Sequence, residues 1–376
     1  MTSSPTWPTR FATRLLHTGH EQDPTTGAAA VPIYQVSMFD QPGLETPGEF
    51  DYARSGNPTR KALEGVLAAL DEGAAAFAFG SGMAAVSSVL MLFSAGDHLV
   101  VTDDCYGGTY RVLTRVFSRF GLQATFVDTS DPDAVRAALR PNTKALFVES
   151  VSNPFLKRTD IPAVARIAKE HGALLIVDNT FLSPCLSRPL TEGADIVIHS
   201  ATKYLGGHSD VIAGTVAVRT PALAQELGFL QNAVGAVLGP QDCFLLQRGI
   251  KTLQVRVERQ VRTAKALAKW LSGRQEVAQV FYPDAGAVVS FRLARDTLAA
   301  PFVESLQLPL LGVSLGAVES IVTVPARHSH AAVPAPERER RGITDGLIRF
   351  SVGLEELEDL QEDLAQAFAK ALRVAA

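Results

Sequence analysis

Short apolar runs alternate with amphipathic stretches between residue 75 and residue 218. The runs are continuous rather than alternating, which is typical of strands buried on both faces of a sheet. They occupy residues 75–79, 98–101, 124–127, 145–148, 173–177, 195–198 and 214–218. Helical stretches such as IPAVARIAKEHG, residues 161–172, separate several of them. This order predicts an α/β fold with a large, mainly parallel sheet of seven strands, covered by helices on both faces.

The two ends of the chain have different patterns. Residues 1–50 are irregular and rich in proline, so we predict an extended arm that lies on another subunit. After residue 221 the pattern is mainly helical, and two later apolar runs, 288–293 and 347–352, predict strands of a smaller α+β unit. A closing amphipathic helix has an apolar face made of Leu357, Leu360, Leu364 and Phe368. The predicted domains are an arm over 1–53, an α/β domain over 54–248 and an α+β domain over 249–376.

Composition narrows the possible partners. The 376 residues are 47% hydrophobic, enough for a sizeable core, and the net charge of −4 offers no electrostatic reason to bind nucleic acid or an anionic membrane. No apolar run reaches the ~18 residues of a membrane span, and the N-terminus lacks the apolar segment of a signal peptide. The three cysteines form no CxxC pair, which disfavours a metal site or disulfide framework. We therefore expect a cytoplasmic protein.

A glycine-rich segment follows the first predicted strand. Gly80, Gly82 and Ala85 fit the G-x-G-x-x-A pattern, and Asp103 and Asp104 end a strand about 20 residues later. This spacing matches a dinucleotide-binding fingerprint. Glycines before a helix also let backbone N–H groups approach any phosphate. The pattern alone leaves open a nicotinamide cofactor, another phosphate-bearing cofactor, and a plain tight turn.

Two charged residues favour a different cofactor. Asp178 directly follows the run ALLIV, and Lys203 follows the next strand, so both are expected at the carboxyl edge of the sheet, where ligands of such sheets bind. Hydroxyls at Ser200 and Thr202 flank the lysine. A lysine can form a Schiff base with an aldehyde, and a carboxylate can keep a pyridine nitrogen protonated. Together these residues indicate an aldehyde cofactor with a pyridine ring and a phosphate.

Eight segments, in order, make a family resemblance visible. They are DYARSGNPTR, FGSGMAA, DDCYGGTYR, ESVSNP, IVDNTF, HSATKYLGGHSDVIAG, SLGAVES and LIRFSVGLE, and they run from about residue 50 to near the C-terminus. The chain resembles the cysteine/methionine-metabolism family of pyridoxal-phosphate enzymes, which includes cystathionine γ-synthase, cystathionine β-lyase and the cystathionine and methionine γ-lyases. The resemblance implies a fold-type I transferase fold, pyridoxal 5'-phosphate as cofactor, and a homo-oligomer, expected to be a tetramer built from dimers that share active sites.

The resemblance also implies roles for single residues. Lys203 would be the Schiff-base lysine that moves the α-proton, Asp178 would pair with the ring nitrogen, and Tyr106 would stack on the ring and take part in proton transfer. Asn153 would contact the ring oxygen. The phosphate would be bound by Gly82, Met83, Ser200 and Thr202, and by Tyr52 and Arg54 of a neighbouring subunit. The carboxylate of a sulfur amino acid substrate would be bound by Arg349, with Ser314 beside it.

Val313 bears on the choice of reaction within the family. Members that act at the γ-carbon commonly have a glutamate at this position, just before Ser314, whereas an apolar residue resembles the β-lyases. Methionine γ-lyases can also have valine, but they carry a cysteine shortly after the stacking tyrosine, and here Gly107 and Gly108 follow Tyr106. The first interpretation is therefore a cystathionine β-lyase that forms homocysteine, pyruvate and ammonia.

Several alternatives stay open at this level. Within the family they are cystathionine γ-synthase, the related O-acyl-homoserine thiolyase, and the γ-lyases. Outside it they are a nicotinamide-dependent dehydrogenase, which needs neither Lys203 nor Asp178, and a cofactor-binding protein without activity, which could dispense with Tyr106 and Arg349.

Overall fold

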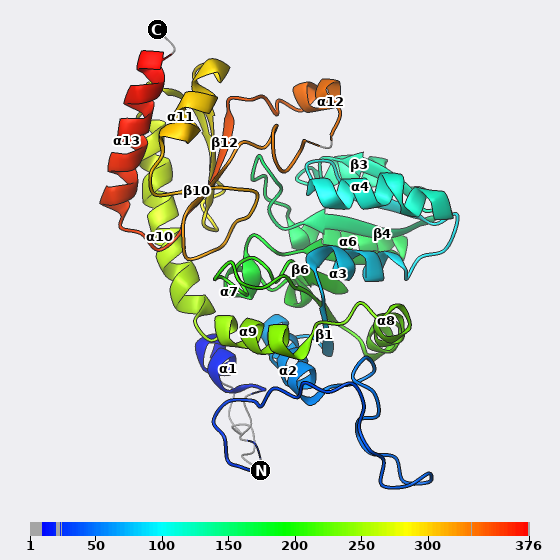
Figure 1. Cartoon of the computed structure of the whole chain (residues 1–376). Helices are drawn as coiled ribbons and strands as arrows, with labels where there is room; N and C mark the ends of the chain where they lie inside the picture. Colours follow the sequence, from blue (N-terminus) through cyan, green and yellow to red (C-terminus); the bar gives the residue numbers. More distant parts are fainter. Residues whose placement is uncertain (1–9, 20–22, 24, 332, 375–376) are drawn as a thin grey trace.

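The computed structural model describes residues 10–19, 23, 25–331 and 333–374 (Figure 1). Its larger sheet has seven strands in the order β1-β7-β6-β5-β4-β2-β3, which confirms the predicted sheet. Strand β7 runs antiparallel to both of its neighbours, and the other pairings are parallel. The strands are β1 (Ala75–Phe79), β2 (His98–Thr102), β3 (Gln123–Val127), β4 (Thr143–Glu149), β5 (Leu174–Asp178), β6 (Ile196–His199) and β7 (Gly214–Val218).

Helices bury both faces of this sheet, as the continuous apolar strands predict. Alternate residues of each strand enter separate core clusters; in β5, for example, Ile176 lies on one face and Val177 on the other. The first face is covered by α3 (Gly82–Leu90), α4 (Gly107–Arg115) and α8 (Pro221–Val234). The second is covered by α2 (Pro58–Asp71), α6 (Ile161–His171) and α9 (Pro240–Ile250), with the short helix α5 (Pro132–Ala137) at its edge.

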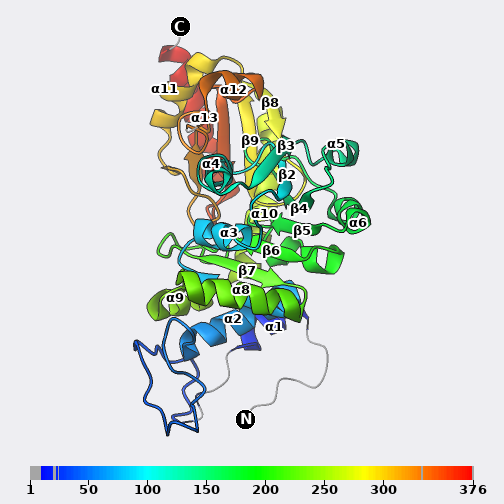
Figure 2. The same ribbon diagram turned by 90° about the vertical axis from the view of Figure 1, so that its right-hand side faces the viewer.

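A second sheet of five strands lies in the C-terminal part, at the top of Figures 1 and 2, in the order β10-β11-β12-β9-β8. Two of its strands, β9 (Val288–Leu293) and β12 (Leu347–Ser351), confirm predicted runs. The others escaped prediction because they are short or mixed in polarity: β8 (Val277–Phe281), β10 (Leu310–Leu311) and β11 (Ile321–Thr323). The helices of this part are α10 (Leu253–Ser272), α11 (Ala299–Ser305), α12 (Ala335–Arg340) and α13 (Leu357–Val374).

The N-terminal segment is less uniform than predicted. Its first nine residues lie outside the described residues, but α1 (Phe11–His17) is a helix whose Leu15 is buried in the main core. The prediction of an irregular extended arm is therefore wrong for these residues. Residues 28–51 contain no helix, are largely exposed, and project from the body near α8 and α9 (Figures 1 and 2). Within the described part of the chain, no helix has both the length and the apolarity to cross a membrane.

Candidate active site

A cavity of about 260 Å³ lies at the carboxyl ends of the central strands of the large sheet. Its floor is formed where β4, β5 and β6 end, one wall by the start of α3 and α4, and another by residues of the smaller sheet. The structure brings most of the predicted site residues to this cavity: Gly82, Met83, Tyr106, Asn153, Asp178, Ser200, Thr202, Lys203, Val313 and Arg349.

Lys203 lies in the loop after β6 and is largely removed from solvent. Its Nζ donates a hydrogen bond of 2.9 Å to Oγ of Ser314, which connects this predicted substrate residue to the cavity. Burial, together with the nearby guanidinium of Arg349, lowers the pKa of Lys203 to about 8. An amine with a pKa this low is in part unprotonated near neutral pH, and the unprotonated form is the nucleophile.

The loop after Lys203 is held by a buried arginine that the sequence did not single out. Arg256, on α10, donates from Nη1 to the carbonyl of Tyr204 at 2.9 Å and from Nη2 to the carbonyl of Gly249 at 2.8 Å. The guanidinium lies so close to Gly207 that a Cβ there would be 2.1 Å from Nη1. Gly207 also has a φ of +77°, which glycine adopts without strain. The second glycine of KYLGG is thus required by this contact.

Two carboxyl groups end adjacent strands at the cavity floor. Asp178 and Glu149 are register partners on β5 and β4. Oδ1 of Asp178 accepts from the backbone N–H of Thr180 at 3.0 Å and from its hydroxyl at 2.6 Å, and burial raises the pKa of Asp178. Burial, and then the charge of Asp178, raise the pKa of Glu149 well above its ordinary value. The pair is therefore best able to accommodate one negative charge, with the second carboxyl protonated.

Glu149 was missed as a functional candidate, although the sequence signal was available. It follows the buried run ALFV in the same way that Asp178 follows ALLIV. Its Oε1 accepts a hydrogen bond of 2.7 Å from the backbone N–H of Tyr106, which seats the start of α4. Tyr106 is 44% exposed. Its ring lies beside Met83, because a Cβ at Gly108 would be 2.4 Å from the ring and 2.8 Å from the methionine sulfur.

The glycine segment forms the N-terminus of α3. Ser81 caps the helix by accepting from the backbone N–H of Ala84 at 3.0 Å, so Gly82 and Met83 occupy the first turn, where N–H groups and the helix dipole favour an anion. A Cβ at Gly82 would lie 3.0 Å from Oγ of Ser200, so a larger residue at this position would crowd the serine. The Thr202 hydroxyl already donates to the carbonyl of Ala213 at 3.2 Å.

Arg349, on β12, is 2% exposed and is the largest fully buried side chain in the described residues. It donates from Nη1 to Oδ1 of Asn153 at 3.0 Å, and from Nη2 to the carbonyl of Ser314 at 3.1 Å and to the hydroxyl of Thr323 at 3.3 Å. All of these acceptors are neutral, and burial lowers the pKa of Arg349 to about 10. A buried guanidinium without a carboxylate, at a cavity wall, suits an anionic ligand group.

Two predicted cofactor residues do not line this cavity. Tyr52 and Arg54 lie at the end of the exposed arm, where Nη1 of Arg54 donates to the carbonyl of Asn232 at 2.7 Å and its guanidinium lies over the Tyr52 ring at 5.6 Å. They cannot complete the site of their own subunit in this arrangement. Their contribution to a neighbouring subunit stays a prediction.

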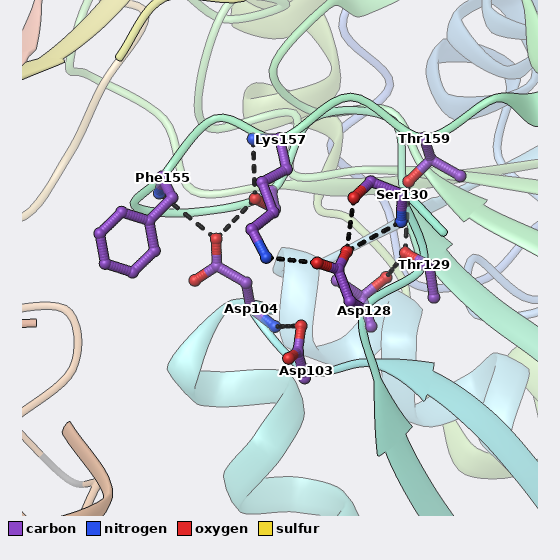
Figure 3. Close-up of polar contacts among 10 residues, drawn as sticks. Asp103, Asp104, Asp128, Thr129, Ser130, Phe155, Lys157 and Thr159 are labelled. Atoms are coloured by element: carbon purple, nitrogen blue, oxygen red, sulfur yellow. Dashed lines mark hydrogen bonds and ion pairs between the residues drawn. The ribbon is translucent and has the colours of Figure 1, made fainter. Parts of the chain in front are cut away.

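The aspartates of the dinucleotide pattern have other partners. Oδ2 of Asp104 accepts from the Ser152 hydroxyl at 2.6 Å. It also accepts from the backbone N–H of Phe155 at 3.3 Å, and Oδ1 of Asp103 accepts from the N–H of Asp104 (Figure 3). Neither aspartate lines the cavity, where a ribose would have to bind. The cavity residues instead fit pyridoxal 5'-phosphate: a lysine with a lowered pKa, a buried carboxyl, an aromatic ring and a helix N-terminus are the groups that its aldehyde, ring nitrogen, ring face and phosphate require.

Comparisons with known proteins agree with this fit. A model of the Cys/Met metabolism PLP-dependent enzymes matches residues 12–369. Over 94% of the chain, the sequence is 51% identical to a cystathionine β-lyase of Bacillus subtilis, covering 95% of that protein, and 50% identical to a cystathionine γ-lyase of the same organism, covering 98% of it. The crystal structure of cystathionine γ-lyase from Lactobacillus plantarum complexed with L-serine superposes with a TM-score of 0.95 at 46% identity, covering 97% of this chain and 100% of that chain. The chain belongs to the family of Cys/Met metabolism enzymes that depend on pyridoxal 5'-phosphate, and it is a carbon–sulfur lyase of that family.

Proposed function

We propose that the protein is a cystathionine β-lyase, which converts cystathionine into homocysteine, pyruvate and ammonia. Identity alone does not separate this reaction from γ-elimination, because relatives named for both reactions are about equally similar. The observation that carries the proposal is Val313. It lines the cavity beside Ser314 and is 64% exposed.

Each cavity residue has a task in this proposal. Pyridoxal 5'-phosphate, when bound, supplies an aldehyde that condenses with amines and a ring that withdraws electrons from the α-carbon of the substrate. Lys203 would hold the cofactor through its amine and, once free, would remove the α-proton. Asp178 would pair with the ring nitrogen, and Glu149, whose pKa is raised well above its ordinary value, would keep its proton. Tyr106 would cover the ring and move a proton, and Asn153 would contact the ring oxygen.

The remaining residues orient the two ligands. The phosphate would be held by the first turn of α3 and the hydroxyls after β6, from Gly82, Met83, Ser200 and Thr202, together with Tyr52 and Arg54 of a neighbouring subunit. The substrate carboxylate binds to Arg349, whose present acceptors are all neutral. Ser314 keeps both Lys203 and Arg349 in place through its hydroxyl and its carbonyl.

Val313 favours β-elimination because it supplies no carboxylate at the cavity wall. A glutamate there would attract the distal ammonium group of cystathionine or position a substrate for γ-chemistry. A charge-assisted contact contributes roughly 1.5–3 kcal/mol, or roughly 10- to 150-fold in relative rate. That range is enough to change the ratio of two competing outcomes while the cofactor chemistry stays the same.

Keto-acid analysis tests this proposal. Wild-type enzyme acting on cystathionine should release mainly pyruvate, and Val313→Glu should shift the ratio toward 2-oxobutanoate. Leu311→Glu is the matched control, since Leu311 is similarly exposed, two residues away on β10, but does not line the cavity. Wild type that releases mostly 2-oxobutanoate, or that forms cystathionine from cysteine and an O-acyl-homoserine far faster than it cleaves it, would show that the reaction is assigned wrongly.

We further propose a homotetramer built from dimers that share active sites, located in the cytoplasm. The position of Tyr52 and Arg54 on an exposed arm, away from their own cavity, supports the sharing of sites. Three free thiols, at Cys105, Cys185 and Cys243, suit a reducing compartment.

A further inference from the structure

The contact between Asn153 and Arg349 joins the two sheets at the active site. Asn153 lies in the turn formed by residues 152–155, which follows β4 of the large sheet, whereas Arg349 is on β12 of the small one. Their hydrogen bond of 3.0 Å fixes one of the two outer nitrogens of the guanidinium. The position of this turn therefore affects the direction in which Arg349 presents its fork to the cavity.

Asp104 holds this turn at three points. Its Oδ2 accepts from the hydroxyl of Ser152 at 2.6 Å. The same oxygen accepts from the backbone N–H of Phe155 at 3.3 Å (Figure 3). Its own carbonyl accepts from the backbone N–H of Asn153 at 3.1 Å. One aspartate thus binds three of the four residues of the turn, including the residue that contacts Arg349.

Burying the Asp104 carboxyl costs free energy, which argues against an incidental contact between Asp104 and the turn. Asp104 is 5% exposed, its second oxygen, Oδ1, is buried without a hydrogen-bond partner among the described residues, and burial raises its pKa to about 6. The nearest lysine does not bind it: Nζ of Lys157 lies 2.5 Å from Asp128 instead, at the protein surface (Figure 3). Burying a carboxyl without a directly bound cation lowers the stability of the fold. Such a group is therefore expected where the hydrogen bonds that it makes serve another purpose, here the position of the turn.

We propose that Asp104 is a positioning residue for substrate binding: it fixes the 152–155 turn, and through Asn153 it aims the guanidinium of Arg349 at the substrate carboxylate. This inference rests on the proposed role of Arg349 and adds to it a residue that touches neither substrate nor cofactor. Its neighbour Asp128 belongs to the same polar network but contacts the turn only through Lys157, so it provides an internal comparison.

Kinetics with the holoenzyme and cystathionine test the inference. Asp104→Ala should raise KM at least about fivefold and lower kcat by less than about twofold. Lys203 is untouched, and Asn153, which would contact the ring oxygen, keeps the hydrogen bond from its N–H to the carbonyl of residue 104. Asp104→Asn should restore KM to within about twofold of wild type, since its amide oxygen can accept the same two hydrogen bonds. Asp128→Asn should leave KM unchanged. A merely structural role of Asp104 would lower the active fraction and the melting temperature but not move KM.

A binding measurement gives a second readout that needs no turnover. The probe is 3-(methylthio)propanoate, which has a carboxylate and a thioether but no α-amino group, so it cannot condense with the cofactor. Its Kd from calorimetry should weaken in Asp104→Ala by the same factor as KM. In Arg349→Ala, binding should be lost altogether.

The outcomes separate the two proposals. Unchanged binding in Arg349→Ala would overturn the proposed role of Arg349 itself. Lost binding in Arg349→Ala with normal KM and Kd in Asp104→Ala would overturn only the positioning role, as would an Asp104→Asn variant as impaired as Asp104→Ala. If Asp104→Ala does not fold, Ser152→Ala decides. It removes the 2.6 Å contact to Asp104, together with the hydrogen bond of 3.0 Å that the Ser152 hydroxyl accepts from the N–H of Lys157. A raised KM supports the inference, and an unchanged KM overturns it.

Discussion

In the cofactor-free protein, Lys203 is expected to lose its proton near pH 8, because burial disfavours its charge and Arg349 lies nearby. The decrease from the ordinary lysine pKa of 10.5 to about 8 corresponds to roughly 3 kcal/mol between the two protonation states. At pH 7, about one Lys203 in ten would then be unprotonated, compared with roughly one lysine in three thousand at the ordinary pKa. The amine is thus prepared to react with an aldehyde before the cofactor arrives.

Competitive labelling of the apoprotein measures this titration. A trace of acetic anhydride is added from about pH 6 to about pH 11, alongside a free lysine amide as the reference, and the Lys203 peptide is quantified by mass spectrometry. The exposed Lys144 monitors the reagent in every sample. The Lys203 labelling midpoint should lie near pH 8, and Arg349→Met should raise it only in part, because burial is the larger cause. A Lys203 midpoint equal to that of the free amide would refute this account of the site.

The same pKa predicts the direction of a stability change. The folded-state pKa of Lys203 is below that of the unfolded chain, so the charged lysine destabilises the apoprotein below pH 8. This penalty is relieved as the pH rises from about 8 toward 10.5. Lys203→Met should therefore stabilise the apoprotein at neutral pH, by up to roughly 3 kcal/mol, and its advantage should shrink in alkaline solution. Urea unfolding at several pH values measures both effects, and an advantage that grows with pH would contradict the sign.

Two further predictions concern the lysine loop and the arm. In chemical unfolding, Gly207→Ala should destabilise the protein by at least about 2 kcal/mol more than Gly172→Ala. Both glycines have a positive φ, but only a Cβ at position 207 collides with Arg256. Equal losses of stability would mean that the structure relieves this collision by a shift elsewhere. If active sites are shared, exchanging subunits between two impaired variants, Arg54→Ala and Lys203→Ala, should recover about a quarter of wild-type activity. Half of the dimers are then mixed, and each mixed dimer has one intact site out of two. Verified exchange without recovery of activity would place Arg54 outside the partner's site.

The large sheet and most of the cavity could be predicted because their signals are local. Each strand is a continuous apolar run, and Asp178 and Lys203 directly follow such runs, so the topology of the sheet alone brings them to one edge. The strand β8 was missed since its residues are partly exposed, with no apolar run to mark it. The helix α1 was missed because it is short and lies between prolines, and Leu15 is buried where α1 packs against α2.

The parts that could not be predicted depend on contacts between distant residues. Asn153 meets Arg349 across 196 positions, and Arg256 reaches the carbonyl of Tyr204 across 52. No periodicity or spacing reports such a pairing. Asp104 is the opposite case. The local sequence pattern singled it out as a possible ribose ligand, but in the structure its carboxylate is bound to the 152–155 turn.

The hydrogen bond that Arg256 makes to the loop after Lys203 also means that the two predicted domains are not independent of each other. A cut at the predicted boundary after Arg248 would leave Lys203, Asp178 and the whole seven-stranded sheet on one fragment, and would remove Arg256 and Arg349 with the other. The N-terminal fragment would keep every residue proposed to hold the phosphate within one subunit. The loop after Lys203, however, would lose its hydrogen bond to Arg256. A gene fusion or domain exchange with this protein therefore has to carry α10 along with the large sheet. That helix follows the predicted boundary in the sequence, but its Arg256 contacts the loop after β6.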